Sequence, residues 1–187
     1  MRKIFKVILI VFVVLIVAGI ASVGIVISDV AGNLATNSQT LPNDAAIGVA
    51  LVVYDPGLSG GAKDAATKIG YNLQTAGYQV VLAGVKSQDA VNITGYNVIV
   101  VGGPIYAGKP ASTIQTYLNT LSPPANAKVG AFGYGSVQID DTNQTAVMQD
   151  VAPLPSSSPV SLSAVVKVVS GGDVDGKCHD FVIRLLM

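Results

Sequence analysis

Short apolar segments alternate with amphipathic ones along most of the chain. Five runs of mainly apolar residues are typical of strands covered on both faces, namely 47–54, 78–83, 96–101, 128–134 and 160–169. Apolar side chains at helical spacing predict helices over 62–75, 110–121 and 179–186, and a short helix within 86–95. Residues 135–159, which contain three prolines, are predicted to be irregular.

This alternation of strands and helices predicts an α/β fold. Right-handed crossovers would build a three-layer sandwich, with a five-stranded parallel sheet between two layers of helices. Sheets of this kind bind ligands at the carboxyl ends of their strands, near the point where the strand order reverses. The loops after the first, third and fourth predicted strands are therefore the candidate site.

The N-terminal part of the chain follows a different pattern. Arg2, Lys3 and Lys6 precede a run of 21 residues without a charge, 7–27. As a helix rising about 1.5 Å per residue, this run would cross the roughly 30 Å hydrocarbon core of a bilayer. We predict a cytoplasmic basic tail over 1–6, one transmembrane helix over 7–27, a flexible linker over 28–45 and a folded domain over 46–187.

The charges around the apolar run give its orientation. The three cations lie on its N-terminal side and the first charge beyond it is Asp29, so the positive-inside bias places the N-terminus in the cytoplasm and the folded domain outside. A cleavable signal peptide is the alternative, since small residues such as Ala21 and Ser22 suit cleavage. The apolar region of such a peptide is normally about 7–15 residues long, which favours the anchor.

Composition excludes several classes of function. Only 12% of the residues are charged, and beyond residue 28 eight Lys and Arg face eleven Asp, a net charge of −3 that suits no nucleic acid partner. The single cysteine, Cys178, excludes an intrachain disulfide. With only one histidine, His179, the chain has too few ligands for a Cys/His zinc site, and we expect no metal.

The first candidate loop is rich in glycine and opens a predicted helix. Backbone N–H groups of Ser59, Gly60, Gly61 and Ala62 would form a nest for a phosphate, and glycine lets the backbone approach its oxygens closely. A tight turn that binds nothing is the alternative. The second loop, 102–109, is predicted to be a long turn that ends the third strand, and Pro110 suits the first position of the following helix.

These loops resemble those of the flavodoxin family, in the segments 54–63 and 101–110, and the likeness extends over 46–187 in strand order and length. The resemblance implies the strand order 2-1-3-4-5 and a bound FMN. Its phosphate would lie on the first loop and its ring between the second and third, with Tyr106 stacked on the flavin and Tyr134 in the other ring-contacting loop. In this chain, Gly57 and Ala62 replace two of the three hydroxyl residues of the family's first loop. The implied cofactor-binding residues are Gly57, Leu58, Ser59, Gly60, Gly61, Ala62, Pro104, Ile105, Tyr106, Ala107, Gly108, Gly133, Tyr134 and Gly135.

Two other arrangements carry possible chemistry. Gly57–Gly61 matches Gly-x-Ser-x-Gly, the nucleophile motif of serine hydrolases, with Ser59 as nucleophile and His179 as base. A carboxylate from Asp140, Asp150 or Asp173 would orient that base. The adjacent Cys178 and His179 point in different directions on a helix and cannot form a dyad.

The prediction favoured by the sequence is a membrane-anchored, flavodoxin-like protein that binds FMN and carries electrons between redox partner proteins. This role requires no catalytic acid or base. A flavodoxin-like module without flavin is the first alternative, and a serine hydrolase that uses Ser59 is the second. Whether the chain forms a homodimer is left open.

Overall fold

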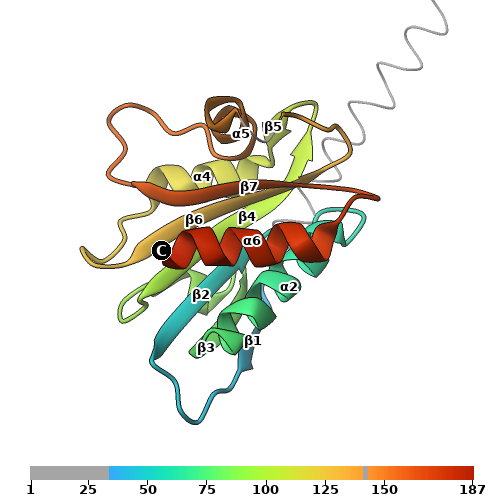
Figure 1. Ribbon diagram of the computed structural model, residues 1–187. Coiled ribbons are helices and arrows are strands. Elements are labelled where there is room, and N and C mark those ends of the chain that lie inside the picture. Colours follow the sequence, from blue (N-terminus) through green and yellow to red (C-terminus); the bar gives the residue numbers. More distant parts are fainter. Residues whose placement is uncertain (1–33, 141–142) are drawn as a thin grey trace, which may run out of the picture.

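A parallel sheet lies at the centre of the computed structural model, which describes residues 34–140 and 143–187 (Figure 1). Five parallel strands follow the order β3-β2-β4-β6-β7. In chain order they are β2 (Gly48–Tyr54), β3 (Tyr78–Gly84), β4 (Val98–Tyr106), β6 (Lys128–Gly135) and β7 (Leu162–Val169). The predicted order 2-1-3-4-5 is therefore confirmed for these five strands.

Two further strands bring the sheet of the described residues to seven, so the predicted number of five is wrong. β1 (Ser38–Leu41) pairs antiparallel with β3 at the edge of the sheet, and β5 (Lys109–Pro110) pairs antiparallel with the end of β4. The flexible linker predicted over 28–45 is thus wrong for Ser38–Leu41. Three of the four β1 side chains face solvent, which is why an apolar pattern did not reveal this strand.

Helices cover both faces of the sheet. α2 (Gly61–Thr75) and α6 (Val174–Leu186) pack side by side on one face (Figure 1). On the other face, α3 (Gln88–Val91), α4 (Ser112–Thr120) and α5 (Gln144–Val151) close a second apolar core. This arrangement confirms the three-layer α/β sandwich.

The helix boundaries differ from the sequence prediction at three places. α5 lies in the stretch 135–159 that was predicted to be irregular. α6 begins five residues before the predicted 179, because the Asp173 carboxylate accepts a hydrogen bond from the Gly176 N–H at 2.8 Å and caps its first turn. α4 begins at Ser112, so Pro110 belongs to β5 and not to the first turn of that helix.

The predicted membrane anchor over 7–27, the tail over 1–6 and the first part of the linker lie outside the described residues. Within residues 34–140 and 143–187, no helix is both long enough and apolar enough to cross a bilayer.

Candidate functional site

The carboxyl ends of β2, β4 and β6 meet at one edge of the sheet, since Tyr54 pairs with Gly102 and Pro104 pairs with Tyr134. The cofactor-binding residues implied by the sequence lie in three segments at this edge. Gly57–Ala62 lead from β2 into α2, Pro104–Gly108 form the end of β4 and its turn, and Gly133–Gly135 end β6. The first segment touches both of the others.

The loop before α2 leaves several backbone amides without an acceptor. Gly60, with φ of 73°, is the N-cap of α2, and no side chain caps the helix. The Gly61 N–H donates to Ser59 Oγ at 3.3 Å. Within the described residues, no acceptor is found for the amides of Ser59, Gly60, Ala62 and Lys63. These N–H groups, at the positive end of a 15-residue helix, are suited to bind an anion.

Asp55 is the first residue after β2, at the start of this loop, and it is fully buried. Its Oδ1 accepts a hydrogen bond from the Gly57 N–H at 2.9 Å, and its Oδ2 accepts one from the Thr113 hydroxyl at the start of α4. Its own N–H donates to Gly102 O at 3.0 Å. The carboxylate therefore joins the first loop to α4. Sequence reasoning missed this residue and Thr113, because the contact connects positions 58 residues apart.

Tyr106 reaches from the second segment to the first. Its hydroxyl accepts a hydrogen bond from the Leu58 N–H at 3.4 Å, and its ring is half-buried against the core on the α4 side. The long turn predicted over 102–109 is wrong, since β4 continues to Tyr106 and pairs with β5 across two residues only. Both turn residues, Ala107 and Gly108, have positive φ, at 50° and 75°, as a type I′ hairpin turn requires.

Tyr134 lies on the opposite side of the first loop, packed with the core under α2 and α6. Its ring covers Gly61 so closely that a Cβ added there would lie 2.2 Å from Tyr134 Cε1. Tyr134 thus contacts the start of α2 and packs against a different apolar core from Tyr106. A Cβ added at Gly133 would lie 2.4 Å from Ile105 Cδ1, so this glycine leaves room for the Ile105 side chain.

A groove of about 870 Å³ opens beside Tyr106, between the β4–β5 hairpin, the start of α4 and the end of α5. Lys109 and Asp150 are its charged lining residues. Asp150 Oδ2 accepts a hydrogen bond at 2.6 Å from Lys167, whose side chain is only 2% exposed. The sequence did not reveal that α5 lines this groove, because that helix was not predicted.

The residues of the hydrolase motif are not brought together. Ser59 lies before α2, whereas His179 Nδ1 is 3.1 Å from Asn72 Oδ1 on the fourth turn of the same helix. At about 1.5 Å per residue, Asn72 lies roughly 16 Å along the helix from its first residue. Two of the candidate carboxylates, Asp150 and Asp173, are engaged with Lys167 and Gly176. The described geometry therefore contradicts a Ser59–His179 pair.

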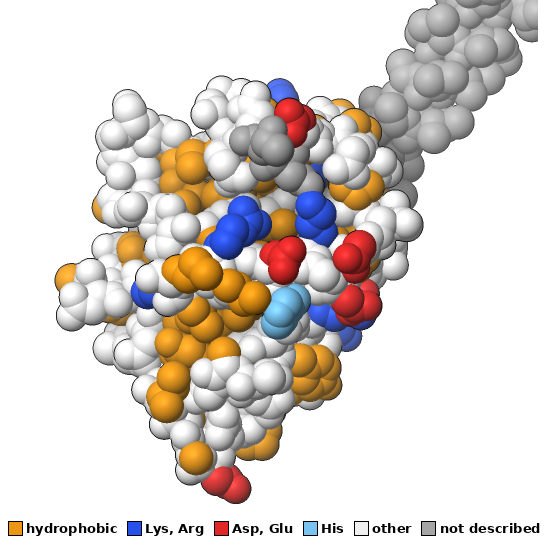
Figure 2. Space-filling model, in the orientation of Figure 1, with side chains coloured by type: hydrophobic (Ala, Val, Ile, Leu, Met, Phe, Trp, Pro, Cys, Tyr) orange, Lys and Arg blue, Asp and Glu red, His pale blue; other side chains and the backbone are white. Residues whose placement is uncertain are grey.

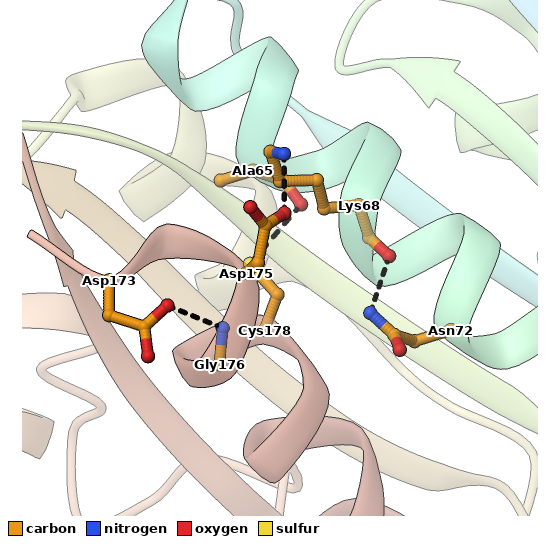
Figure 3. Close-up of polar contacts among 7 residues, drawn as sticks. All are labelled: Ala65, Lys68, Asn72, Asp173, Asp175, Gly176 and Cys178. Atoms are coloured by element: carbon orange, nitrogen blue, oxygen red, sulfur yellow. Dashed lines mark hydrogen bonds and ion pairs between the residues drawn. The ribbon is translucent and has the colours of Figure 1, made fainter.

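Cys178 is a buried packing residue at the contact between α2 and α6 (Figure 3). Its thiol donates weakly to Ala65 O at 3.7 Å, and burial raises the pKa of this thiol to about 12. Lys68 and Asp175 form an ion pair of 2.5 Å nearby on the surface. Figure 2 shows this face, with charged side chains and the single histidine toward one end of α6 and apolar side chains toward its C-terminal end.

Solved structures of flavodoxins share this fold. A short-chain flavodoxin associated with a PDU bacterial microcompartment matches with a TM-score of 0.56 and 17% identity, over 75% of this chain and 97% of that one. The two-electron reduced flavodoxin of Megasphaera elsdenii matches with 0.53 and 15% identity, over 73% and 97%. The Streptococcus pneumoniae TIGR4 flavodoxin matches with 0.52 and 14% identity, over 74% and 97%. No family model and no curated protein matches the chain. The fold is therefore flavodoxin-like.

Proposed function

We propose that this chain binds FMN at the carboxyl edge of the sheet and carries electrons between redox partner proteins. The observation that carries the proposal is a set of amides around the start of α2, at Ser59, Gly60, Ala62 and Lys63, for which residues 34–140 and 143–187 supply no acceptor. A phosphate group would accept hydrogen bonds from these amides and gain from the helix dipole. The flavodoxin-like fold supports the same assignment.

The flavin ring would pack against Tyr106. The hydroxyl of this residue accepts a hydrogen bond from Leu58, in the loop before α2. One ligand can therefore reach both the ring of Tyr106 and the amides of that loop. Leu58 and Val137, in the first and third loops, are 51% and 66% exposed. A planar apolar ring would cover such side chains, which otherwise face water at a cost of about 25 cal/mol per Å² of apolar area.

FMN supplies reversible one- and two-electron transfer when it is bound, and the chain's own residues bind and orient it. The backbone amides hold the phosphate end, and the aromatic face of Tyr106 limits the access of water to the ring. This role asks for no proton transfer by a side chain. The redox partners are proteins of unassigned identity that would dock where the exposed edge of the ring emerges.

Anchoring is part of the same proposal. The uncharged run over 7–27, with its three preceding cations, would hold the domain at the outer surface of the membrane with the N-terminus in the cytoplasm. Protease treatment of intact cells is expected to remove the folded domain. Protection of the domain in intact cells, with cleavage only after lysis, would place it on the cytoplasmic side.

FMN titration of the purified full chain tests the binding proposal. We expect quenching of flavin fluorescence at micromolar FMN or below. Tyr106→Leu should weaken binding by about tenfold, as the loss of one stacking ring implies. Tyr71→Leu removes a tyrosine that is 51% exposed on α2 and should change nothing. Failure of the wild-type chain to take up FMN at micromolar concentration would contradict the proposal.

A flavodoxin-like module without flavin is the second candidate. It is favoured by Tyr134, whose ring covers the start of α2, and by the Gly57 amide, which is already bonded to Asp55. In that case the groove beside Tyr106 would take a different ligand or a partner protein. The same titration separates the two candidates, since this one predicts no flavin uptake by a correctly folded chain.

A further inference from the structure

The buried carboxylate of Asp55 is not used by any role described so far. It directly follows the central strand β2 and precedes the loop into α2, in which the amides of Ser59, Gly60, Ala62 and Lys63 find no acceptor among the described residues. A fully buried carboxylate is costly unless it is hydrogen-bonded, and Asp55 accepts bonds from Gly57 and Thr113. The start of α4 also favours its negative charge, since Thr113 is in the first turn of that helix.

Asp55 divides the amides of the loop into two groups. The first amide, that of Gly57, is committed to Asp55 Oδ1 at 2.9 Å and is not available to a ligand. Four amides further along, those of Ser59, Gly60, Ala62 and Lys63, have no acceptor in the part of the chain that the structure describes. Gly103 allows this arrangement, because a Cβ added there would lie 2.9 Å from Asp55 Cβ.

We propose that Asp55 is a positioning residue of the anion site at the start of α2, with a second effect through its charge. By holding Gly57 it fixes the loop and confines a bound phosphate to the amides of Ser59, Gly60, Ala62 and Lys63. Its negative charge, 2.9 Å from the Gly57 amide at the start of the same loop, repels the phosphate, so anions bind more weakly than the amides alone would allow. This inference rests on the proposed function, because it concerns the same site.

The charge has a consequence for a bound flavin. Any gain of negative charge by the flavin on reduction is opposed by a nearby fixed carboxylate. Asp55 therefore lowers the reduction potential of FMN bound at this edge. A residue with a purely structural role would not change the potential of the bound cofactor in this specific direction.

Asp55→Asn isolates the charge from the hydrogen bonds. The asparagine Oδ1 can still accept from the Gly57 N–H, and its amide can donate to the Thr113 hydroxyl. Thr113→Val is the complementary variant, because it removes one hydrogen bond and keeps the charge. Asp64→Asn is the matched control, since it removes an exposed carboxylate from the first turn of α2.

Inorganic phosphate is the probe and is titrated into the full chain. The amide NMR shifts of residues 57–63 report its binding. We expect Asp55→Asn to tighten phosphate about tenfold, the order expected for removal of one nearby charge at a partly buried site. Asp64→Asn should change the phosphate affinity less than twofold, and Thr113→Val should not increase it.

A second measurement concerns bound FMN, whose reduction potential Asp55→Asn should raise. Circular dichroism verifies the fold of each variant.

The outcomes separate the two proposals. Phosphate binding that tightens in Asp55→Asn, without FMN uptake, would support the role of Asp55 and overturn the flavin proposal. Both the wild type and Asp55→Asn could bind FMN with the same reduction potential and bind phosphate with the same affinity. That result would overturn the role of Asp55 only. A correctly folded Asp55→Asn that binds phosphate more weakly, or a wild-type chain that shows no phosphate shifts at residues 59–63, would also overturn it.

Discussion

At the scale of single residues, Gly61 is a position at which a side chain would overlap the Tyr134 ring. A Cβ there would lie 2.2 Å from Tyr134 Cε1, so either the ring or the start of α2 must move. We expect Gly61→Ala to lower the free energy of unfolding by about 1–3 kcal/mol, the usual cost of overpacking. Urea denaturation measures this loss.

A double-mutant cycle identifies the cause of that loss. If the Tyr134 ring is the obstacle, Gly61→Ala should cost much less in a Tyr134→Ala background than in the wild type. An equal cost in both backgrounds would show that the ring does not limit this position.

Cys178 carries the second prediction at this scale. Burial raises the pKa of its thiol to about 12, so the reactive thiolate is scarce in the folded chain at pH 8.5. Alkylation by iodoacetamide should be slow in the native chain and fast in guanidinium chloride. The unfolded thiol ionises near pH 8.5, so the stability from this group is complete below that pH and is lost as pH rises toward 12. Rapid alkylation of the native chain would contradict this description.

Features of the candidate site were predictable where the signal is local. Glycines next to a strand end and before a helix indicated amides at the start of that helix, and the structure places them there, four of them without an acceptor among its described residues. Asp55 and Thr113 were not predictable, because their contact depends on how β2 and α4 are placed in the fold. Gly133 was interpreted from its sequence neighbourhood, but its close neighbour Ile105 comes from an adjacent strand.

At the scale of elements, the β4–β5 hairpin holds an alanine in an unfavourable conformation. Ala107 has φ of 50°, where asparagine and glycine are preferred in the first position of a type I′ turn. We expect Ala107→Asn to stabilise the chain by about 0.5–1 kcal/mol in thermal denaturation. The control is Ala125→Asn, an exposed alanine without positive φ, which should change stability little. Equal effects of the two substitutions would contradict the role of the turn.

The contact between α5 and β7 supplies a second prediction for elements. Lys167 is almost completely buried, and Asp150 is its partner. Asp150→Ala leaves a buried ammonium without a counter-charge and should lower the free energy of unfolding by about 2–3 kcal/mol. This loss is smaller than for a fully buried pair, because the Asp150 side chain is 26% exposed. Lys167→Met deletes the same ion pair but leaves no buried charge, so it should be within about 1 kcal/mol of the wild type. Urea denaturation compares them, and a greater loss for Lys167→Met would contradict this reasoning.

The strands that sequence patterns revealed are those buried on both faces, and the helices are those with a regular apolar face. The central strands are continuous apolar runs for that reason. β1 lies at the sheet edge with mostly exposed side chains, and α5 buries only Val147 and Val151 in a polar stretch, so neither has a clear period. β5 consists of two residues and exists through its pairing with β4.

At the scale of the whole molecule, strand order determines where a ligand can bind. β3 lies on one side of β2 and β4 on the other, so the order in which the chain adds strands reverses between β2 and β4. The loop before α2 and the hairpin that carries Tyr106 meet at this point. The sequence predicted this edge as the site because parallel strands end together. It did not predict that Tyr106 and Tyr134 would lie on opposite sides of the first loop.

The central claim is that this edge recognises a flavin through its phosphate. Comparing the affinities of the full chain for FMN and for riboflavin, which lacks the phosphate, tests it most directly. Hydrogen bonds to a charged group contribute about 1.5–3 kcal/mol each, so we predict FMN to bind at least about 100-fold more tightly. Equal affinity for the two flavins, or no binding of FMN by a correctly folded chain, would contradict the claim.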